Sequence, residues 1–350
     1  MSHDPTVNAG DIARLAGVGR AAVSNWRRRH DDFPDPIGGT ANQPLFSLRQ
    51  VESWLRHYGK SYQVSLGDRV WQRLKAAGDL RLGELVARAG ALLTSRANAL
   101  SSGPAGADPR AGDEVVPGVA RAGAEGEPGE GAEAAGQDLE PEGLEPELAE
   151  LVLELAEQHG ALTAYEFLCE RYLEAHSRQL SVTREDVAGL MVRLVRPGGT
   201  TILDPACGVG TLLLAPTLAQ TEPGGSGAVK VLGQELSETS AAITASRLRL
   251  RGIEAEVVAG DSMRHDAFPG EKADAVVCDP PFNERAWGYE ELTGDPRWEY
   301  GLPPRGEPEL AWVQHCLTHV KPRGLVAILM PPAAASRKAG RRIRANLLRA

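Results

Sequence analysis

The sequence predicts an α/β protein with a parallel sheet, joined to a separate small helical unit near its N-terminus. Two apolar runs, within residues 200–214 and 275–283, each pass from a strand pattern into a turn at an acidic residue. Between these runs strand and helix patterns alternate, which is typical of a Rossmann-like sheet with crossover helices. Before residue 60 the pattern is helical instead, with short glycine and proline breaks.

Length and composition limit the number of folded units and the class of protein. With 350 residues and 42% hydrophobic content, the chain can bury a sizeable core and should hold two or more units. No apolar run approaches the ~20 residues of a membrane span, and no signal-peptide pattern opens the chain, so we expect a cytoplasmic protein without a membrane partner. The four cysteines lie far apart without a CxxC pair, which favours reduced, buried thiols over disulfides or a zinc site.

The net charge of −9 hides a partition of charge along the chain. Residues 1–100 hold 14 basic and 9 acidic side chains, residues 101–150 hold 2 and 13, and residues 151–350 hold 22 and 25. The N-terminal part is therefore basic, and a nucleic-acid partner is compatible with the composition.

Residues 1–60 have the pattern of a winged helix-turn-helix. A helix over 11–16, a glycine break and a helix over 20–29 form the motif whose second helix enters the major groove. Ser47, followed three residues later by Gln50, is the capping box of a third helix. The unit resembles the domains of excisionase and MerR-type regulators, and an oligomerisation or protein-docking module is the alternative. The residues expected to face DNA are Arg20, Ser24, Asn25, Arg27 and Arg28.

Four further segments follow. Residues 61–100 show helical periodicity and form an extension. Residues 101–146 contain mainly Gly, Ala, Glu and Pro, which predicts a disordered acidic linker. Residues 147–196 are again helical and are expected to cap one face of the sheet. Residues 197–350 form the catalytic domain.

The glycine turn of that domain is Asp204-Pro205-Ala206-Cys207-Gly208-Val209-Gly210. A dinucleotide fingerprint needs a small residue three positions after the second glycine, and Leu213 occupies that position. The carboxylate of Asp204 would repel a pyrophosphate, but it could bind the ammonium group of an amino-acid-like cofactor. This combination points to S-adenosylmethionine.

Acids also end the next three strands. Glu235 lies at the tip of the second strand, where it can accept hydrogen bonds from ribose hydroxyls, and Asp261 follows the third, where it can accept from an adenine amino group. The fourth strand ends at Asp279-Pro280-Pro281-Phe282. A carboxylate and free carbonyls beside an aromatic ring suit a planar amine, such as the exocyclic amine of a nucleobase.

The order Asp-Pro-Ala-Cys-Gly-x-Gly, then Asp-Pro-Pro-Phe-Asn, within roughly Leu162 to Leu348 resembles the adenine-specific DNA methyltransferases. The modification subunits of type I restriction–modification systems are the most similar group. The resemblance implies an S-adenosylmethionine-dependent methyltransferase fold, methylation of a flipped-out adenine at N6 in double-stranded DNA, and specificity and restriction subunits as candidate partners. It implies cofactor binding by Thr183, Asp204, Ala206, Gly208, Gly210, Glu235 and Asp261, and base binding by Asp279, Pro280, Pro281 and Phe282.

Two positions depart from the family pattern. Asp279 stands where the family usually has Asn, and Val182-Thr183-Arg184 stands where Phe/Tyr-Thr-Pro is common. We therefore keep two alternatives: a catalytically impaired, DNA-binding regulator of the same fold, and a methyltransferase for a protein glutamine amide or an RNA base. No metal site is expected, because His315 and His319 lack a third ligand in the sequence.

The family fold ordinarily continues for two more strands. We therefore expect the catalytic domain to be incomplete at its C-terminus, with residues 325–330 forming an unprotected sheet edge.

Overall fold

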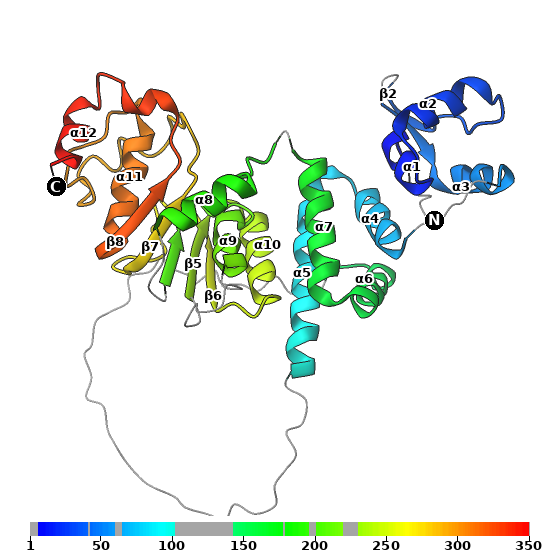
Figure 1. The fold of residues 1–350 in the computed structure, drawn as a ribbon, viewed down its shortest axis with the longest axis horizontal. Helices are drawn as coiled ribbons and strands as arrows, with labels where there is room; N and C mark the ends of the chain where they lie inside the picture. The colour runs from blue at the N-terminus through cyan, green and yellow to red at the C-terminus, as the bar shows by residue number, and fades with distance from the viewer. Residues whose placement is uncertain are drawn as a thin grey trace, which may run out of the picture.

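The computed structural model describes residues 6–40, 43–59, 65–101, 143–177, 179–195, 201–219 and 230–349. Along the chain these form a small N-terminal unit, a bundle of helices and an α/β domain (Figure 1). The segment predicted to be a disordered linker falls mainly on residues 102–142, which lie outside the described residues. Among the described helices, none is both long and apolar enough to cross a bilayer.

The N-terminal unit combines three helices with a small antiparallel sheet of order β1-β3-β2. Asn8 and Asp11 form a reciprocal capping box at the first helix, and Ser47 Oγ accepts from the Gln50 amide at the third. In this sheet β2 and β3 form an antiparallel hairpin, whose strands the helical pattern of the sequence did not predict. The elements are β1 (Thr6–Val7), α1 (Ala9–Leu15), α2 (Arg20–Arg29), β2 (Gly38–Thr40), β3 (Gln43–Ser47) and α3 (Leu48–His57).

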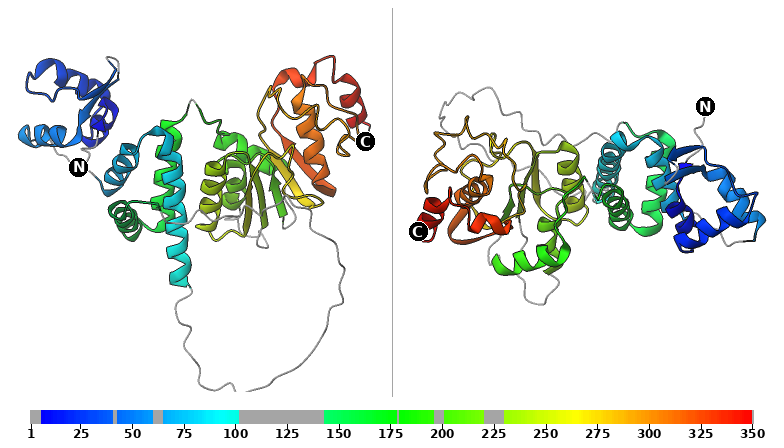
Figure 2. Two further views of the ribbon diagram at one scale, coloured as in Figure 1. Left: turned by 180° about the vertical axis from the view of Figure 1, so that it is seen from behind. Right: turned by 90° about the horizontal axis from the view of Figure 1, so that it is seen from above.

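Four helices form the bundle, and their apolar stripes share one core. They are α4 (Leu66–Ala76), α5 (Asp79–Ser101), α6 (Pro146–His159) and α7 (Ala161–Ala175). The expectation that the helices of residues 147–196 cap one sheet face is wrong for α6 and α7, whereas the helix over residues 185–195 does pack on the sheet. The apolar side chains of α6 and α7 pack on α4 and α5, and the bundle meets the α/β domain through α10 (Glu238–Arg249), which lies beside α5 and α7 (Figure 2). Glu166 of α7 reinforces this contact through Arg247 and Arg251, each at 2.7 Å.

The α/β domain is built on a five-stranded sheet of order β6-β5-β4-β7-β8, in which every neighbouring pair is parallel. All strands therefore present their carboxyl ends at one edge, and the strand order reverses at β4, which is where such sheets bind ligands. The strands are β4 (Thr201–Asp204), β5 (Lys230–Glu235), β6 (Ala255–Ala259), β7 (Ala273–Cys278) and β8 (Val320–Ile328).

Alternation along the strands assigns side chains to two cores. Ile202 and Val231 pack with α8 (Glu185–Val195) and α9 (Thr211–Ala219) on one face. Leu203 and Leu232 pack on the other face with α11 (Pro308–Thr318) and with tryptophans of the preceding segment. The α/β fold class is confirmed, and a 3-10 turn η1 (Pro332–Ala335) and α12 (Arg341–Leu347) follow β8.

Candidate active site

Four acids meet at the carboxyl edge of the sheet. Asp204 and Glu235 end β4 and β5, while Asp261 and Asp279 follow β6 and β7. The sequence-predicted acids are therefore brought to one edge of four adjacent strands. Only Asp261 of these four forms an ion pair among the described residues, so the other three carboxylates favour a positively charged ligand.

Asp204 is the most deeply buried of them. Its Oδ1 accepts a hydrogen bond from the Ala206 amide at 3.0 Å, whereas Oδ2 is buried and has no partner among the described residues. Burial raises the pKa of Asp204 well above its usual value, and the charges of Glu235 and Asp279 raise it further. A cationic donor aimed at Oδ2 would satisfy this atom and favour the ionised form.

The glycine turn leads from β4 into α9 in a geometry that needs glycine. Gly208 has a φ of 53° and Gly210 a φ of 88°, both in the left-handed region. A Cβ atom on Gly210 would lie 2.9 Å from Thr244 Cγ2, so helix α10 closes against the turn. Thr244 Oγ1 also donates to the Gly208 carbonyl at 2.8 Å. Thr244 of α10 consequently holds the turn at both glycines.

Glu235 links the glycine turn to the start of α10. Its Oε2 accepts from the Gly208 amide at 3.0 Å, and its Oε1 accepts from the Ser237 amide at 2.9 Å. Each carboxylate oxygen has a second lone pair, so both can still accept from a diol. Glu235 therefore both shapes the turn and presents acceptors beside it.

Asp261 lies at the rim of the site. It accepts from the Met263 amide at 3.0 Å and forms an ion pair with Arg264 Nη1 at 2.6 Å. Arg264 also pairs with Glu291 Oε2 at 2.7 Å. Of the predicted cofactor residues, Asp261 is thus the one whose carboxylate is already paired with a cation.

The turn after β7 carries a carboxylate, that of Asp279, and an aromatic ring, that of Phe282. Asp279 is half-buried, and Phe282 is 40% exposed although it is a large apolar side chain. Asn283, the next residue, has a φ of 60° and completes the turn. Thr183 Oγ1 donates to Asp279 Oδ2 at 2.7 Å, so Thr183 contacts the turn after β7.

Two residues that sequence reasoning missed hold this turn. Glu309 is fully buried and pairs with Arg337 Nη1 at 2.8 Å. Arg337 Nη2 also donates to Asn283 Oδ1 at 2.7 Å, and the Asn283 amide lies 3.4 Å from Glu309 Oε1. Glu309 is 26 positions and Arg337 is 54 positions away from Asn283 in the chain, and no local pattern connects them.

Asp266 lies close to His315 and His319 and is the third candidate metal ligand that the sequence pattern did not indicate. Arg297 Nη1 lies 3.0 Å from His315 Nδ1, and a guanidinium can only donate. The neutral His315 ring therefore keeps its proton on Nε2, which removes that atom as a metal ligand. At most Asp266 and His319 remain, so the cluster is a polar network of the core.

Burial argues against the cysteines near the site as nucleophiles. Cys207 and Cys278 are buried, and burial raises the pKa of each thiol well above its usual value. All four cysteines of the chain are buried free thiols, as predicted. The carboxylates, the backbone and the aromatic ring are the other groups that this edge offers for chemistry.

Outside this edge, α2 displays the residues expected to face DNA. All five are exposed, and Val23 points into the core of the unit. Arg28 Nη2 donates to Asn25 Oδ1 at 2.6 Å, and the Arg27 guanidinium lies 5.2 Å from the ring centre of Phe46. The exposed residues are Arg20, Ser24, Asn25, Arg27 and Arg28.

The chain is similar in sequence to methylase subunits of known restriction enzymes. The chain is 30% identical over 171 residues to the type I restriction enzyme HindI methylase subunit of Haemophilus influenzae, an alignment covering 47% of this chain and 39% of that protein. It is 28% identical over 182 residues to the MjaIX methylase subunit of Methanocaldococcus jannaschii, covering 49% and 32%. The chain thus spans less than half the length of these relatives.

Among solved structures, a type I restriction-modification methyltransferase subunit from Streptococcus thermophilus is 24% identical, with a TM-score of 0.49 over 58% of this chain and 47% of that one. Residues 158–350, more than half of the chain, match the sequence profile described as N-6 DNA Methylase. The chain therefore belongs to the N-6 DNA methylase family.

Proposed function

We propose that the protein is an S-adenosylmethionine-dependent DNA methyltransferase that modifies the N6 atom of adenine within a restriction–modification system. The observation that carries this proposal is the juxtaposition of an orphaned buried carboxylate, Asp204, with the Asp279-to-Phe282 turn at one sheet edge. The family assignment and the methylase subunits among the relatives support the same function.

The residues present fit the cofactor. Its ammonium and sulfonium groups carry positive charge, and the site offers Asp204 Oδ2 and a surplus of carboxylates. Ala206, Gly208 and Gly210 belong to the turn that follows Asp204, with open space where a Cβ atom on Gly208 would lie. Glu235 presents acceptors for the ribose hydroxyls, and Asp261 lies at the rim for the adenine. When bound, S-adenosylmethionine supplies an electrophilic methyl group.

The chain's own groups bind and activate the target amine. The Asp279 carboxylate and the Pro280 carbonyl accept hydrogen bonds from the adenine amino group, which draws its lone pair out of conjugation with the ring. Pro281 keeps the turn stiff, and Phe282 stacks on the base. Positioning alone supplies up to ~7–11 kcal/mol in favourable models, and the carboxylate adds electrostatic stabilisation of charge developing on the nitrogen.

An adenine inside a duplex cannot reach this turn. The base must be flipped out, at a cost of a few kcal/mol. Stacking on an aromatic side chain offsets about 1–3 kcal/mol of that cost. The 40% exposure of Phe282 leaves its ring available for this contact.

The proposal also assigns a role to the N-terminal unit. The basic unit of residues 1–60 binds double-stranded DNA through α2, using Arg20, Ser24, Asn25, Arg27 and Arg28. A specificity subunit and a restriction subunit are the proposed protein partners, in keeping with the names of the relatives.

The test is incubation with labelled S-adenosylmethionine and unmethylated genomic DNA, followed by nucleoside analysis. We expect N6-methyladenine from the wild type and from Asp279→Asn, which keeps an acceptor oxygen. Asp279→Ala should lose at least about a hundredfold in kcat while DNA binding survives. If a specificity subunit is also supplied and no methyladenine forms, the proposal is wrong.

A further inference from the structure

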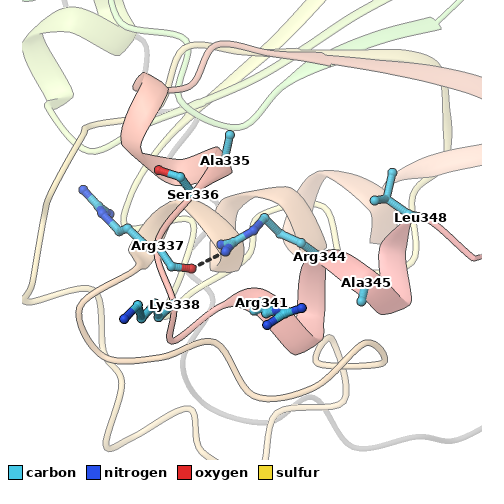
Figure 3. A pocket seen from close by; sticks show the side chains of 8 residues that line it. All are labelled: Ala335, Ser336, Arg337, Lys338, Arg341, Arg344, Ala345 and Leu348. Atoms are coloured by element: carbon cyan, nitrogen blue, oxygen red, sulfur yellow. Dashed lines mark hydrogen bonds between the residues drawn. The ribbon is translucent and has the colours of Figure 1, made fainter.

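A basic groove lies beside the target-base turn. Residues 336–349 contain six Lys or Arg residues and no Asp or Glu, in a chain whose net charge is −9. A hollow of about 490 Å³ opens along this segment, between η1 and α12. Its polar lining comes from Ser336, Arg337, Lys338, Arg341 and Arg344, whose side chains are drawn in Figure 3.

Two of these cations are used within the protein. Arg337 pairs with Glu309 at 2.8 Å, and Arg344 pairs with Glu307 at 3.1 Å. Arg344 also donates to the Arg337 carbonyl, which ties α12 to the segment before it (Figure 3). Both arginines therefore shape the groove rather than carry its free charge.

The other two lining cations are free to bind a ligand. Lys338 and Arg341 are exposed, and no carboxylate of the described residues forms an ion pair with either. Two uncompensated cations in one hollow repel each other and attract polyanions. The groove therefore fits a ligand that carries more than one negative charge.

Arg337 connects the groove to the site. Its Nη1 reaches Glu309, while its Nη2 donates to Asn283 Oδ1 at 2.7 Å. Asn283 directly follows Phe282, the ring on which we place the flipped adenine. One end of the groove therefore lies next to the position of the target nucleotide.

We propose that this groove binds the sugar-phosphate backbone of the DNA strand next to the flipped adenine. This inference rests on the proposed function. Lys and Arg side chains bind backbone phosphates without reading sequence, so the groove fixes where the target strand lies relative to Phe282. A flipped nucleotide remains attached to its flanking phosphates, which must pass close to the turn. Lys338 and Arg341 provide the charges for those phosphates.

The experiment measures binding of the full chain to a duplex oligonucleotide at several salt concentrations. The test variant is Lys338→Ala/Arg341→Ala. The matched control is Arg81→Ala/Arg96→Ala, which removes the same charge from two exposed positions of α5. We expect the test variant to bind DNA about tenfold more weakly at low salt, with the slope of log K against log salt reduced by about 0.9 for each phosphate that is no longer neutralised. The control should keep the wild-type affinity and slope.

Unchanged affinity and slope in the test variant would overturn the proposal, as would an equal loss in the control. Cofactor affinity, measured by thermal shift, should stay at the wild-type value in both variants; its loss in the test variant alone would show a folding defect and also count against the proposal. If the wild type binds DNA through this groove but forms no methyladenine, the proposed function fails and the groove stands.

Discussion

Thr183 Oγ1 donates a hydrogen bond to Asp279 Oδ2 at 2.7 Å, joining two residues that are 96 positions apart. One carboxylate oxygen is thereby fixed, and the other is left for the target amine of the proposed function. A hydroxyl donor can pair with an oxygen of either Asp or Asn, so this contact is compatible with both residues at position 279. The bond explains how a carboxylate keeps one orientation in the turn after β7.

Replacing Thr183 with Val removes the hydroxyl at nearly constant volume. A hydrogen bond to a charged group contributes about 1.5–3 kcal/mol, so we expect kcat to fall roughly ten- to hundredfold with little change in DNA affinity. Thr183→Ser should restore most of the rate. Steady-state methylation kinetics check this. A rise in the cofactor dissociation constant at unchanged kcat would instead place Thr183 with the cofactor residues.

Asp204 should make cofactor binding depend on pH. Burial, with the charges of Glu235 and Asp279, raises its pKa, so the carboxyl ionises only as pH rises through that raised value. We expect the affinity for S-adenosylmethionine, measured by calorimetry between pH 5 and 7, to increase with pH. Asp204→Asn should cost about 2–5 kcal/mol of binding and abolish the increase.

The effect of Asp204 on the stability of the ligand-free protein should have the opposite pH dependence: its stabilising contribution should decrease as pH rises. Because its folded-state pKa is raised, the contribution of Asp204 to stability is present below the unfolded pKa and is lost as pH rises through the folded one. Chemical denaturation of wild type and Asp204→Asn across the same pH range tests this. A wild type whose stability relative to the variant increases with pH would contradict it.

His315 should lower stability in acid. Burial, then the charges of His319 and Arg297, lowers its pKa to about 3, against 6.5 in the unfolded chain, while Asp266 and Asp295 oppose this shift. The stabilising contribution is therefore complete above pH 6.5 and is lost as pH falls towards 3. We expect wild type to lose about 1.4 kcal/mol more per pH unit than His315→Gln in this window. Parallel denaturation curves at pH 6.5 and 4.5 measure the difference, and equal slopes would refute the assignment.

Arg337 should matter to the site in a way that Arg344 does not. Both form ion pairs with carboxylates that are almost fully buried, Glu309 and Glu307, so Arg337→Met and Arg344→Met should each cost about 3–5 kcal/mol of stability. Only the first releases Asn283 and the turn before it.

Fluorescence of 2-aminopurine at the target position separates these roles. At a temperature where both variants remain folded, Arg337→Met should reduce the flipping signal, and Arg344→Met should leave it near the wild-type level. Equal signals from the two variants would show that the Glu309–Arg337 pair only stabilises the fold.

Local patterns were enough to locate the strands and their acids. The fourth strand, predicted to end at Asp279, is observed as Ala273–Cys278, because an apolar run followed by two prolines has few alternatives. The acids Asp204 and Glu235 lie at strand ends for the same reason: crossover units place every carboxyl end on one edge. The α/β domain and most of its site could thus be predicted from residues adjacent in the chain.

Contacts between distant segments could not be predicted in this way. The apolar stripes of α6 and α7 fit a sheet face or another helix equally well, and only the packing on α5 distinguishes them. Asp266 lies close to His315 and His319 although it comes from a different segment of the chain. Glu309 forms an ion pair with Arg337, and β8 lies between the two in the chain. Side-chain type and periodicity hold no information on which distant partner completes such a group.

Glu235 holds the amides of Gly208 and Ser237 through its own two carboxylate oxygens. The loop that would receive the cofactor is therefore ordered in advance, and little conformational entropy remains to be lost on binding. Affinity at this end of the site should come from enthalpy and electrostatics rather than from a folding step. The protein would then discriminate between the methyl donor and its demethylated product mainly by the charge on sulfur, because the ammonium group and the shape of the cradle are the same for both.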